Sequence, residues 1–233
     1  MTPRALSAPA RAFAWAGAAL FLVSLLYCVL TYEGTMGRTA GASFAVLPNV
    51  LFNFALFSAF ALHHSLFARE RVRHRVQQLV SPGLERSVYV WIASLMLIAV
   101  CAAWRPVHGA VWEVTGPAAW LLRALQAAGV WLTIRSAAVI DVLELAGVHE
   151  SRTAEFRTQG PYGWVRHPIY SGWLLVVFSE PSMTATRATF AVVSGLYLLV
   201  AIPFEERSLL AGTGDGYRRY AAKVRWKLIP RLY

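Results

Sequence analysis

Residues 158–172 read TQGPYGWVRHPIYSG, and a later hydrophobic run ends in PFEER at residues 203–207. The apolar residues between these two motifs are divided by Glu180-Pro181-Ser182, which predicts a turn. They therefore predict a helical hairpin in the membrane, with arms at Ile169–Ser179 and about Thr186–Phe204. Charged side chains at a membrane boundary are costly unless they have a role. The Arg-His-Pro turn and the paired carboxylates at the two ends of this hairpin are thus candidate functional groups.

The composition indicates the class of protein. Of the 233 residues, 57% are hydrophobic and only 15% are charged, and the mean hydropathy is +0.49. Soluble proteins carry about 25% charged residues on average. The sequence therefore predicts an all-α, polytopic integral membrane protein whose surroundings are the lipid bilayer.

Six apolar segments predict five to six transmembrane helices, because a spanning helix needs about 20 apolar residues. The four segments before the hairpin are Ala10–Tyr32, about Phe44–Phe67, Val88–Trp104 and Ala118–Ile140. The first is too long for the apolar region of a signal peptide, so it predicts a helix that is retained. We expect residues 1–150 to form the N-terminal helices and residues 151–233 the C-terminal hairpin and tail, in one integrated membrane domain.

The basic residues predict the orientation. Seventeen Lys and Arg residues lie at the N-terminus, in alternate connections and in the tail, against three on the opposite side, Arg38, Arg105 and Arg187. The positive-inside rule then places both termini and the Arg-His-Pro turn in the cytoplasm. No basic stripe interleaves with exposed aromatic residues, so the net charge of +10 does not predict nucleic-acid binding.

Local rules describe the turn before the hairpin. Gly160-Pro161-Tyr162 predicts a turn, and Pro168 suits the first position of a helix. A helix that starts there points its N–H groups and positive dipole end toward Arg166 and His167, a favourable place for a ligand carboxylate. The alternative is structural: Arg166 reaches lipid phosphates and His167 caps the helix.

Together the two motifs resemble the isoprenylcysteine carboxyl methyltransferase superfamily, over about Thr158–Pro230. The resemblance implies S-adenosylmethionine as cofactor, and no metal. The residues that it implies for cofactor binding are Gly160, Pro161, Tyr162, Arg166, His167, Pro168, Tyr170, Glu205, Glu206, Tyr217 and Tyr220.

The paired carboxylates suit a cofactor that carries a sulfonium and an ammonium group. Adjacent helical residues point about 100° apart, so Glu205 and Glu206 cannot face one ligand equally. One of them is expected to pair with Arg166 or Arg207; a solvated helix end is the alternative.

Tyr217 and Tyr220 lie one turn apart in an amphipathic tail, where they either stack on the adenine or anchor the tail at the membrane surface.

A narrower resemblance covers the N-terminal half. The segments concerned are HHSLFAR at 63–69, ERSVYV at 85–90, WRP at 104–106, VW at 111–112 and DVLELAG at 141–147. They look like the bacterial methanethiol S-methyltransferases and their NnrU-like relatives. This implies methylation of methanethiol to dimethyl sulfide, with hydrogen sulfide as a further acceptor, in the bacterial inner membrane with the active site facing the cytoplasm.

The catalytic residues implied for this reaction are His64, Arg166 and Glu206. His64 would orient or deprotonate the thiol, since histidine titrates near neutrality; a structural hydrogen-bonding role is the alternative. For so small a thiol we expect a small pocket lined by Phe60, His64 and Trp173. Other readings are an enzyme of the same fold that acts on an isoprenoid, lipid or xenobiotic acceptor, and a non-catalytic protein of the NnrU type.

Two further features predict no chemistry. The glycines of residues 211–216 follow no strand, so they do not form a dinucleotide-binding motif. Cys28 and Cys101 lie in separate apolar segments without CxxC spacing, which predicts packing residues rather than a disulfide or a metal site.

Overall fold

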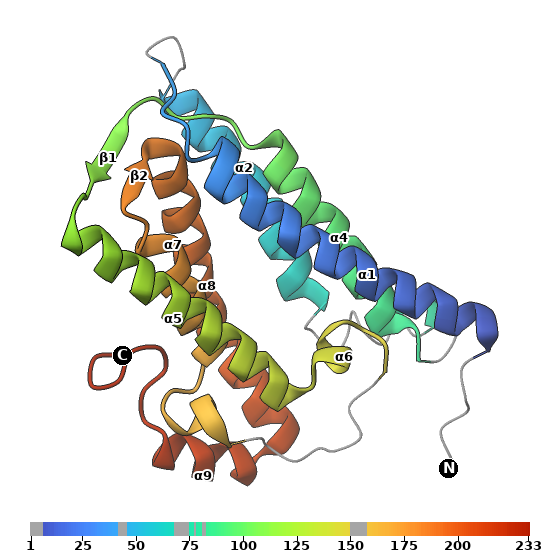
Figure 1. The fold of residues 1–233 in the computed structure, drawn as a ribbon. Coiled ribbons are helices and arrows are strands. Elements are labelled where there is room, and N and C mark those ends of the chain that lie inside the picture. Colours follow the sequence, from blue (N-terminus) through green and yellow to red (C-terminus); the bar gives the residue numbers. More distant parts are fainter. Residues whose placement is uncertain (1–6, 42–45, 68–74, 77, 81–82, 150–157) are drawn as a thin grey trace.

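The apolar segments of the sequence form helices in the computed structural model (Figure 1), which describes residues 7–41, 46–67, 75–76, 78–80, 83–149 and 158–233. The elements are α1 (Ala8–Leu30), the π-helix η1 (Thr31–Thr35), α2 (Val46–Phe67), α4 (Glu85–Ala103), β1 (Ala110–Glu113), α5 (Pro117–Ile140), α6 (Val142–Leu145), the 3-10 helix η2 (Gly160–Gly163), α7 (Pro168–Phe178), β2 (Ser182–Thr184), α8 (Ala185–Thr213) and α9 (Asp215–Lys223).

Among the helices in the described residues, four are long and apolar enough to cross a membrane. They are Ala8–Thr35, Val46–Leu66, Glu85–Ala103 and Ala185–Thr213. This confirms the predicted all-helical, polytopic membrane protein, although five to six spanning helices were expected. Helix α5 has 24 residues but carries polar side chains and is not among the four, and α7, with 11 residues, is too short.

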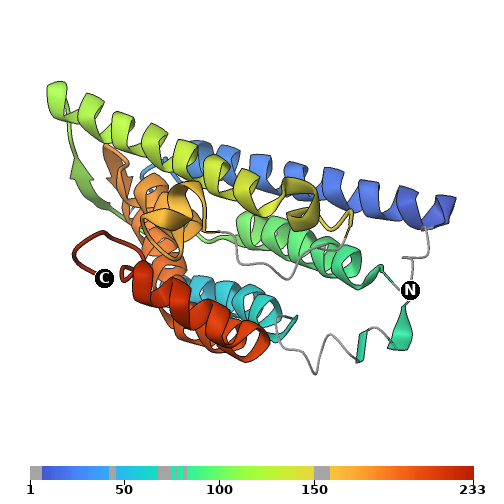
Figure 2. The same ribbon diagram turned by 90° about the horizontal axis from the view of Figure 1, so that it is seen from below.

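Two pairs of helices are joined by α2 and α8, because α2 contacts α4 as well as α8. Helix α1 lies along α4 and α5 lies along α7, whereas α8 contacts both α7 and α2. In Figure 2, α1 and α5 lie on one side of the molecule and α2 and α8 on the other. Cys28 on α1 and Cys101 on α4 are both buried in the shared core, as predicted.

Two glycines bring α5 and α7 close together. A Cβ atom added to Gly129 would stand 2.7 Å from the carbonyl oxygen of Gly172, and one added to Gly172 would overlap the Thr133 hydroxyl. Small residues let helix backbones approach closely in membrane proteins. The last residue of the TQGPYGWVRHPIYSG stretch is therefore a packing residue, which holds α7 against α5.

A small antiparallel sheet, which the sequence did not predict, joins the α4–α5 connection to the hairpin turn. Strands β1 and β2 pair Ala110 with Thr184 and Glu113 with Ser182, with an irregularity between them. The indole N–H of Trp112 donates to the carbonyl of Glu180 at 2.9 Å. With four and three residues, such strands are too short for an alternating pattern to reveal them.

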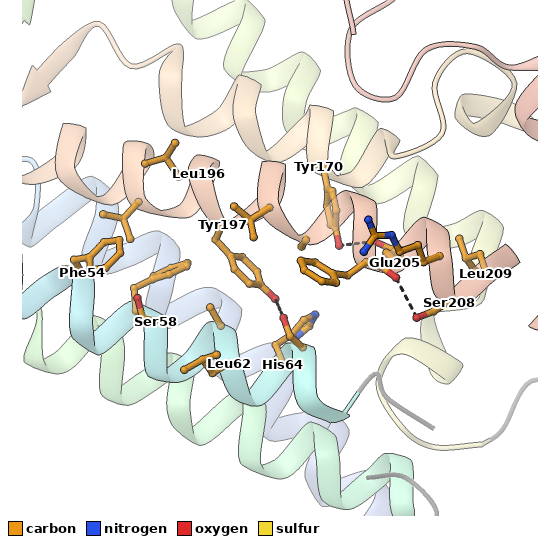
Figure 3. Close-up of a pocket in the computed structure, with 18 residues that line it drawn as sticks. Phe54, Ser58, Leu62, His64, Tyr170, Leu196, Tyr197, Glu205, Ser208 and Leu209 are labelled. Atoms are coloured by element: carbon orange, nitrogen blue, oxygen red, sulfur yellow. Dashed lines mark hydrogen bonds between the residues drawn. The ribbon is translucent and has the colours of Figure 1, made fainter. Parts of the chain in front are cut away.

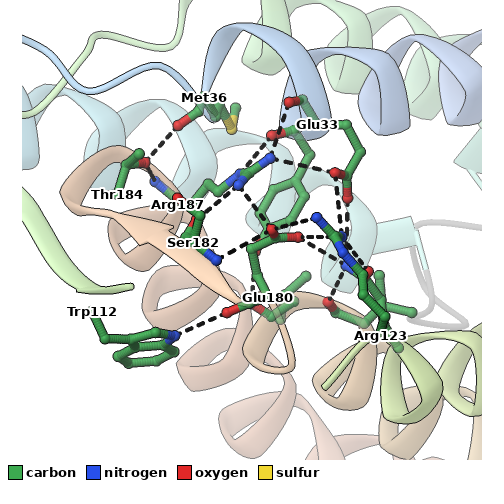
Figure 4. Close-up of polar contacts among 12 residues, drawn as sticks. Glu33, Met36, Trp112, Arg123, Glu180, Ser182, Thr184 and Arg187 are labelled. Carbon is green, nitrogen blue, oxygen red and sulfur yellow. Dashed lines mark hydrogen bonds and ion pairs between the residues drawn. The ribbon is translucent and has the colours of Figure 1, made fainter. Parts of the chain in front are cut away.

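The hairpin turn carries an ion-pair cluster around the buried Glu180 (Figure 4). The Glu180 side chain is 0% exposed, and its two oxygens each accept a hydrogen bond of 2.9 Å from the Arg123 guanidinium. Arg187 lies 3.0 Å from the same carboxylate, and Glu33 lies 3.4 Å from Arg187. The cluster connects η1, α5, the turn and α8, so it ties the C-terminal hairpin to the first helix.

We expect Glu180→Gln to lower the free energy of unfolding by about 1.5–3 kcal/mol, because its contacts with the buried Arg187 and the half-exposed Arg123 lose their charge. Unfolding in mixed micelles measures this change. Glu113→Gln, at an exposed glutamate on β1, is the matched control and should change stability by no more than about 0.5 kcal/mol. Equal stability of the two variants would show that the cluster does not hold the fold together.

Candidate active site

The Arg-His-Pro turn forms as local rules predict. Gly160 has φ of +59°, a left-handed conformation that glycine adopts without strain, and it opens the 3-10 turn η2. Pro168 is the first residue of α7, where its missing N–H costs nothing. The turn therefore delivers Arg166 and His167 to the start of α7.

The tail lies against this turn through its backbone. The N–H groups of Arg166 and His167 donate to the carbonyls of Trp226 and Lys227, each at 2.9 Å. Pro168 has no N–H to offer. Part of the helix start that was expected to receive a ligand carboxylate thus pairs with the protein's own tail.

The Arg166 side chain holds the same tail. Its Nε donates to Glu206 Oε1 at 2.7 Å, and its Nη1 donates to the carbonyls of Val224 and Arg225 at 3.0 and 2.8 Å. The side chain is 10% exposed, so it does not reach out to lipid phosphates. The predicted pairing of one carboxylate with Arg166 is confirmed, and Glu206 is the residue that makes it.

Glu205 has different surroundings. It accepts a hydrogen bond of 2.8 Å from the Tyr170 hydroxyl and lies 3.6 Å from Nδ1 of His167, whose Nε2 lies 3.3 Å from Glu206. The Glu205 side chain is 44% exposed against 17% for Glu206. The two carboxylates therefore point in different directions, as neighbouring residues on a helix must. Glu206 binds Arg166, which holds the tail, and Glu205 remains partly exposed.

The two tail tyrosines are buried beneath the turn. Tyr220 donates to the Tyr162 carbonyl at 2.9 Å, and burial raises the pKa of Tyr220 to about 12. Burial and a hydrogen bond with Glu206 raise the pKa of Tyr217 above its ordinary value. Because both side chains are enclosed by protein, the membrane-anchoring interpretation of this pair is wrong.

A groove of about 870 Å³ runs between α2 and α8 (Figure 3). One end of it lies at Tyr170 and Glu205, beside the start of α7. The polar groups at that end belong to His64, Ser65, Tyr170, Tyr197, Glu205, Arg207 and Ser208, and most of the remaining lining is apolar. Pockets of about 300–1,000 Å³ hold drug-sized ligands. The groove is therefore larger than the small acceptor pocket that was expected.

The lining of the groove also differs from the prediction. His64 lines it, but Phe60 and Trp173 pack against the hydrophobic core, and the Trp173 indole donates to Ser194 at 3.0 Å. A helical sequence pattern does not show which side of an apolar helix meets a cavity when all sides are apolar.

His64 is positioned from a neighbouring helix. Its Nδ1 shares a short hydrogen bond with the hydroxyl of Tyr89 on α4, and its ring contacts Tyr197 edge-on. Tyr197 in turn lies 3.3 Å from the Ser65 hydroxyl. Tyr89 and Tyr197 were not predicted as site residues. The available signals were the ERSVYV segment for Tyr89 and, for Tyr197, a tyrosine within an apolar run.

Comparison with known proteins identifies the family. No protein-family model matches the chain. A methanethiol S-methyltransferase of Bradyrhizobium diazoefficiens is 35% identical, covering 92% of this chain and 87% of the relative. One from Mycobacterium tuberculosis is also 35% identical, covering 88% and 89%. The chain belongs to the methanethiol S-methyltransferase family.

The relatives named methanethiol S-methyltransferase favour an enzyme over the non-catalytic alternative. Nurim of Xenopus laevis is a more partial relative, 32% identical over 61% of this chain and 56% of its own length.

The predicted site residues of this family member fall into three places. Those that line the groove are His64, Tyr170 and Glu205. Those that support its polar end are Arg166, His167, Glu206, Tyr217 and Tyr220. Those that shape the turn are Gly160, Pro161, Tyr162 and Pro168.

Glu206→Gln should loosen the tail, because hydrogen bonds to charged groups contribute about 1.5–3 kcal/mol. We expect the amides of Arg166 and His167, which donate to the tail, to exchange with deuterium roughly tenfold faster or more. Hydrogen exchange with mass spectrometry measures this. Glu205→Gln is the matched control and should leave these amides protected; equal exchange in both variants would contradict the division of roles.

Proposed function

We propose that this protein transfers a methyl group from S-adenosylmethionine to the sulfur of methanethiol, which gives dimethyl sulfide. The names of the relatives support the acceptor. The observation that carries the proposal is the polar end of the groove, where a half-exposed carboxylate, Glu205, and a histidine, His64, line the same cavity.

The residues fit the donor. When bound, S-adenosylmethionine supplies a methyl group on a positively charged sulfur, which makes that group electrophilic. Glu205 is held by Tyr170 yet remains 44% exposed, so its carboxylate can take a cationic partner. Tyr170 and Glu205 would contact the donor, while Arg166 and Glu206 support them from behind.

His64 is the proposed group for the acceptor. The thiolate is the nucleophile, and an ordinary thiol has a pKa of about 8.5 and is mostly protonated at neutral pH. A neutral histidine at the groove wall would accept the S–H proton, which leaves the thiolate beside the donor site. Tyr89 holds the ring in place through its hydrogen bond with Nδ1. An adjacent general base of this kind contributes typically 10²–10⁴-fold.

The two roles separate in variants. Glu205→Gln should weaken S-adenosylmethionine binding about tenfold or more in calorimetry, because a charge-assisted contact is lost.

His64→Ala should keep donor binding and lower methanethiol turnover about 10²-fold at neutral pH. The difference from the wild-type rate should shrink at high pH, where the thiol ionises without a base. Dimethyl sulfide in the headspace is the readout. Wild-type protein that binds the donor but forms no dimethyl sulfide would reject the proposed function.

We infer that the site faces the cytoplasm of a bacterial inner membrane. The start of α7 and the end of α8 lie at the same end of the molecule, near α9 (Figure 1). The tail at this end carries seven Lys and Arg residues from Arg207 to Arg231, which the positive-inside rule assigns to the cytoplasm. Cytoplasmic access suits a charged, water-soluble donor.

Reporter fusions to the two termini test this orientation. An alkaline phosphatase fusion at either end should be inactive, and a green fluorescent protein fusion at either end should fluoresce, because the first requires export and the second requires the cytoplasm. Export of either terminus would overturn the orientation and the route proposed for the donor.

A further inference from the structure

The groove extends far beyond the polar end that methanethiol would occupy. It follows α2 from His64 back to Phe54, ten residues along the helix, which corresponds to about 15 Å. Figure 3 shows Phe54 and Leu196 at one end and Tyr170 and Glu205 at the other. An acceptor with a single carbon would leave most of this apolar length without substrate.

The groove opens toward the bilayer. Leu62 on α2 and Leu196 and Val200 on α8 line it, and each is more than half exposed. Both helices are long and apolar enough to span the membrane. A hydrophobic acceptor dissolved in the hydrocarbon can therefore enter between α2 and α8 without crossing water, with its polar head directed to His64.

We propose that this groove binds the alkyl chain of the acceptor, so that the enzyme methylates medium-chain alkyl thiols such as hexanethiol in addition to methanethiol. The inference rests on the proposed thiol methylation and names a wider substrate class for the same site. The thiol lies at the polar end, and the chain runs along α2 and α8 toward Phe54.

The chemistry is unchanged by chain length. The S–H proton passes to His64, the thiolate sulfur forms a bond to the methyl carbon, and the bond between that carbon and the donor sulfur breaks with its electron pair remaining on the donor. Only the alkyl chain differs between the two thiols. Each CH₂ group moved from water into an apolar site favours binding by up to about fourfold, from about 0.8 kcal/mol per group.

Two neighbouring residues on α2 provide a matched test. Ser58 lines the groove and lies six residues from His64, about 9 Å along the helix, so a larger side chain there meets the alkyl chain and not the thiol. Ala59 is exposed on the adjoining face and lies outside the groove lining. Ser58→Phe fills the groove, and Ala59→Phe adds the same ring to the neighbouring surface.

The experiment compares hexanethiol and methanethiol as substrates of the full-length protein in lipid nanodiscs. At equal aqueous concentrations the wild type should use hexanethiol with a kcat/KM at least equal to that for methanethiol. Ser58→Phe should lower the ratio of the two kcat/KM values tenfold or more, whereas Ala59→Phe should leave it unchanged. If Ser58→Phe does not fold, Leu196→Trp on the opposite wall should lower the same ratio.

Three results overturn the inference or its basis. Methylation of methanethiol without hexanethiol would reject the alkyl-chain site and leave the proposed function intact. Hexanethiol turnover that is equally unaffected by Ser58→Phe, Leu196→Trp and Ala59→Phe would place the chain elsewhere. If the wild type binds the donor and methylates neither thiol, the proposed function itself fails.

Discussion

The site depends on the ion pair between Arg166 and Glu206. One carboxylate oxygen accepts from the arginine Nε at 2.7 Å and lies 3.3 Å from His167, while the same guanidinium binds two tail carbonyls. This arrangement joins the start of α7, the part of α8 about two turns before its end at Thr213, and the tail at a single point. Charge-assisted hydrogen bonds in a partly buried setting are stronger than neutral ones. Because the tail is held there, the turn keeps its shape and Glu205 keeps its direction.

The opposite end of the hairpin is closed by a second set of charges. Glu180 is fully buried between Arg123 and Arg187, so the turn between α7 and α8 is attached to α5 and to η1, which follows α1. Such a cluster has a high desolvation cost, which its hydrogen bonds must offset. The short helix α7 is therefore fixed at both ends, and the glycine contact with α5 fixes its middle. A rigid hairpin of this kind suits a reaction that depends on alignment of two reactants.

The groove is large and apolar compared with the acceptor for which the family is named. The methanethiol S-methyltransferase family is named for a very small acceptor, yet the cavity beside His64 in this member has a volume of about 870 Å³ and is mostly apolar. Apolar pockets discriminate weakly between substrates that differ by a methylene group, by about 1–3 kcal/mol each. In the alkyl-chain site that we propose, acceptor choice follows from the length and shape of the space between α2 and α8 as well as from the reacting groups.

The sequence by itself determined the membrane class, the positions of the helices and the motifs at the polar ends of the hairpin. Long apolar segments have one stable arrangement in lipid, and Pro168 and Gly160 act through local backbone rules. It did not determine that Glu206 and not Glu205 pairs with Arg166, that Tyr217 and Tyr220 are buried, or that Phe60 and Trp173 face the core. Nor did it show the cluster around Glu180, whose members Glu33, Arg123 and Arg187 are far apart in the chain. These outcomes depend on which helix faces meet. Only tertiary structure decides that, because a helix that is apolar on all sides carries no pattern to orient it.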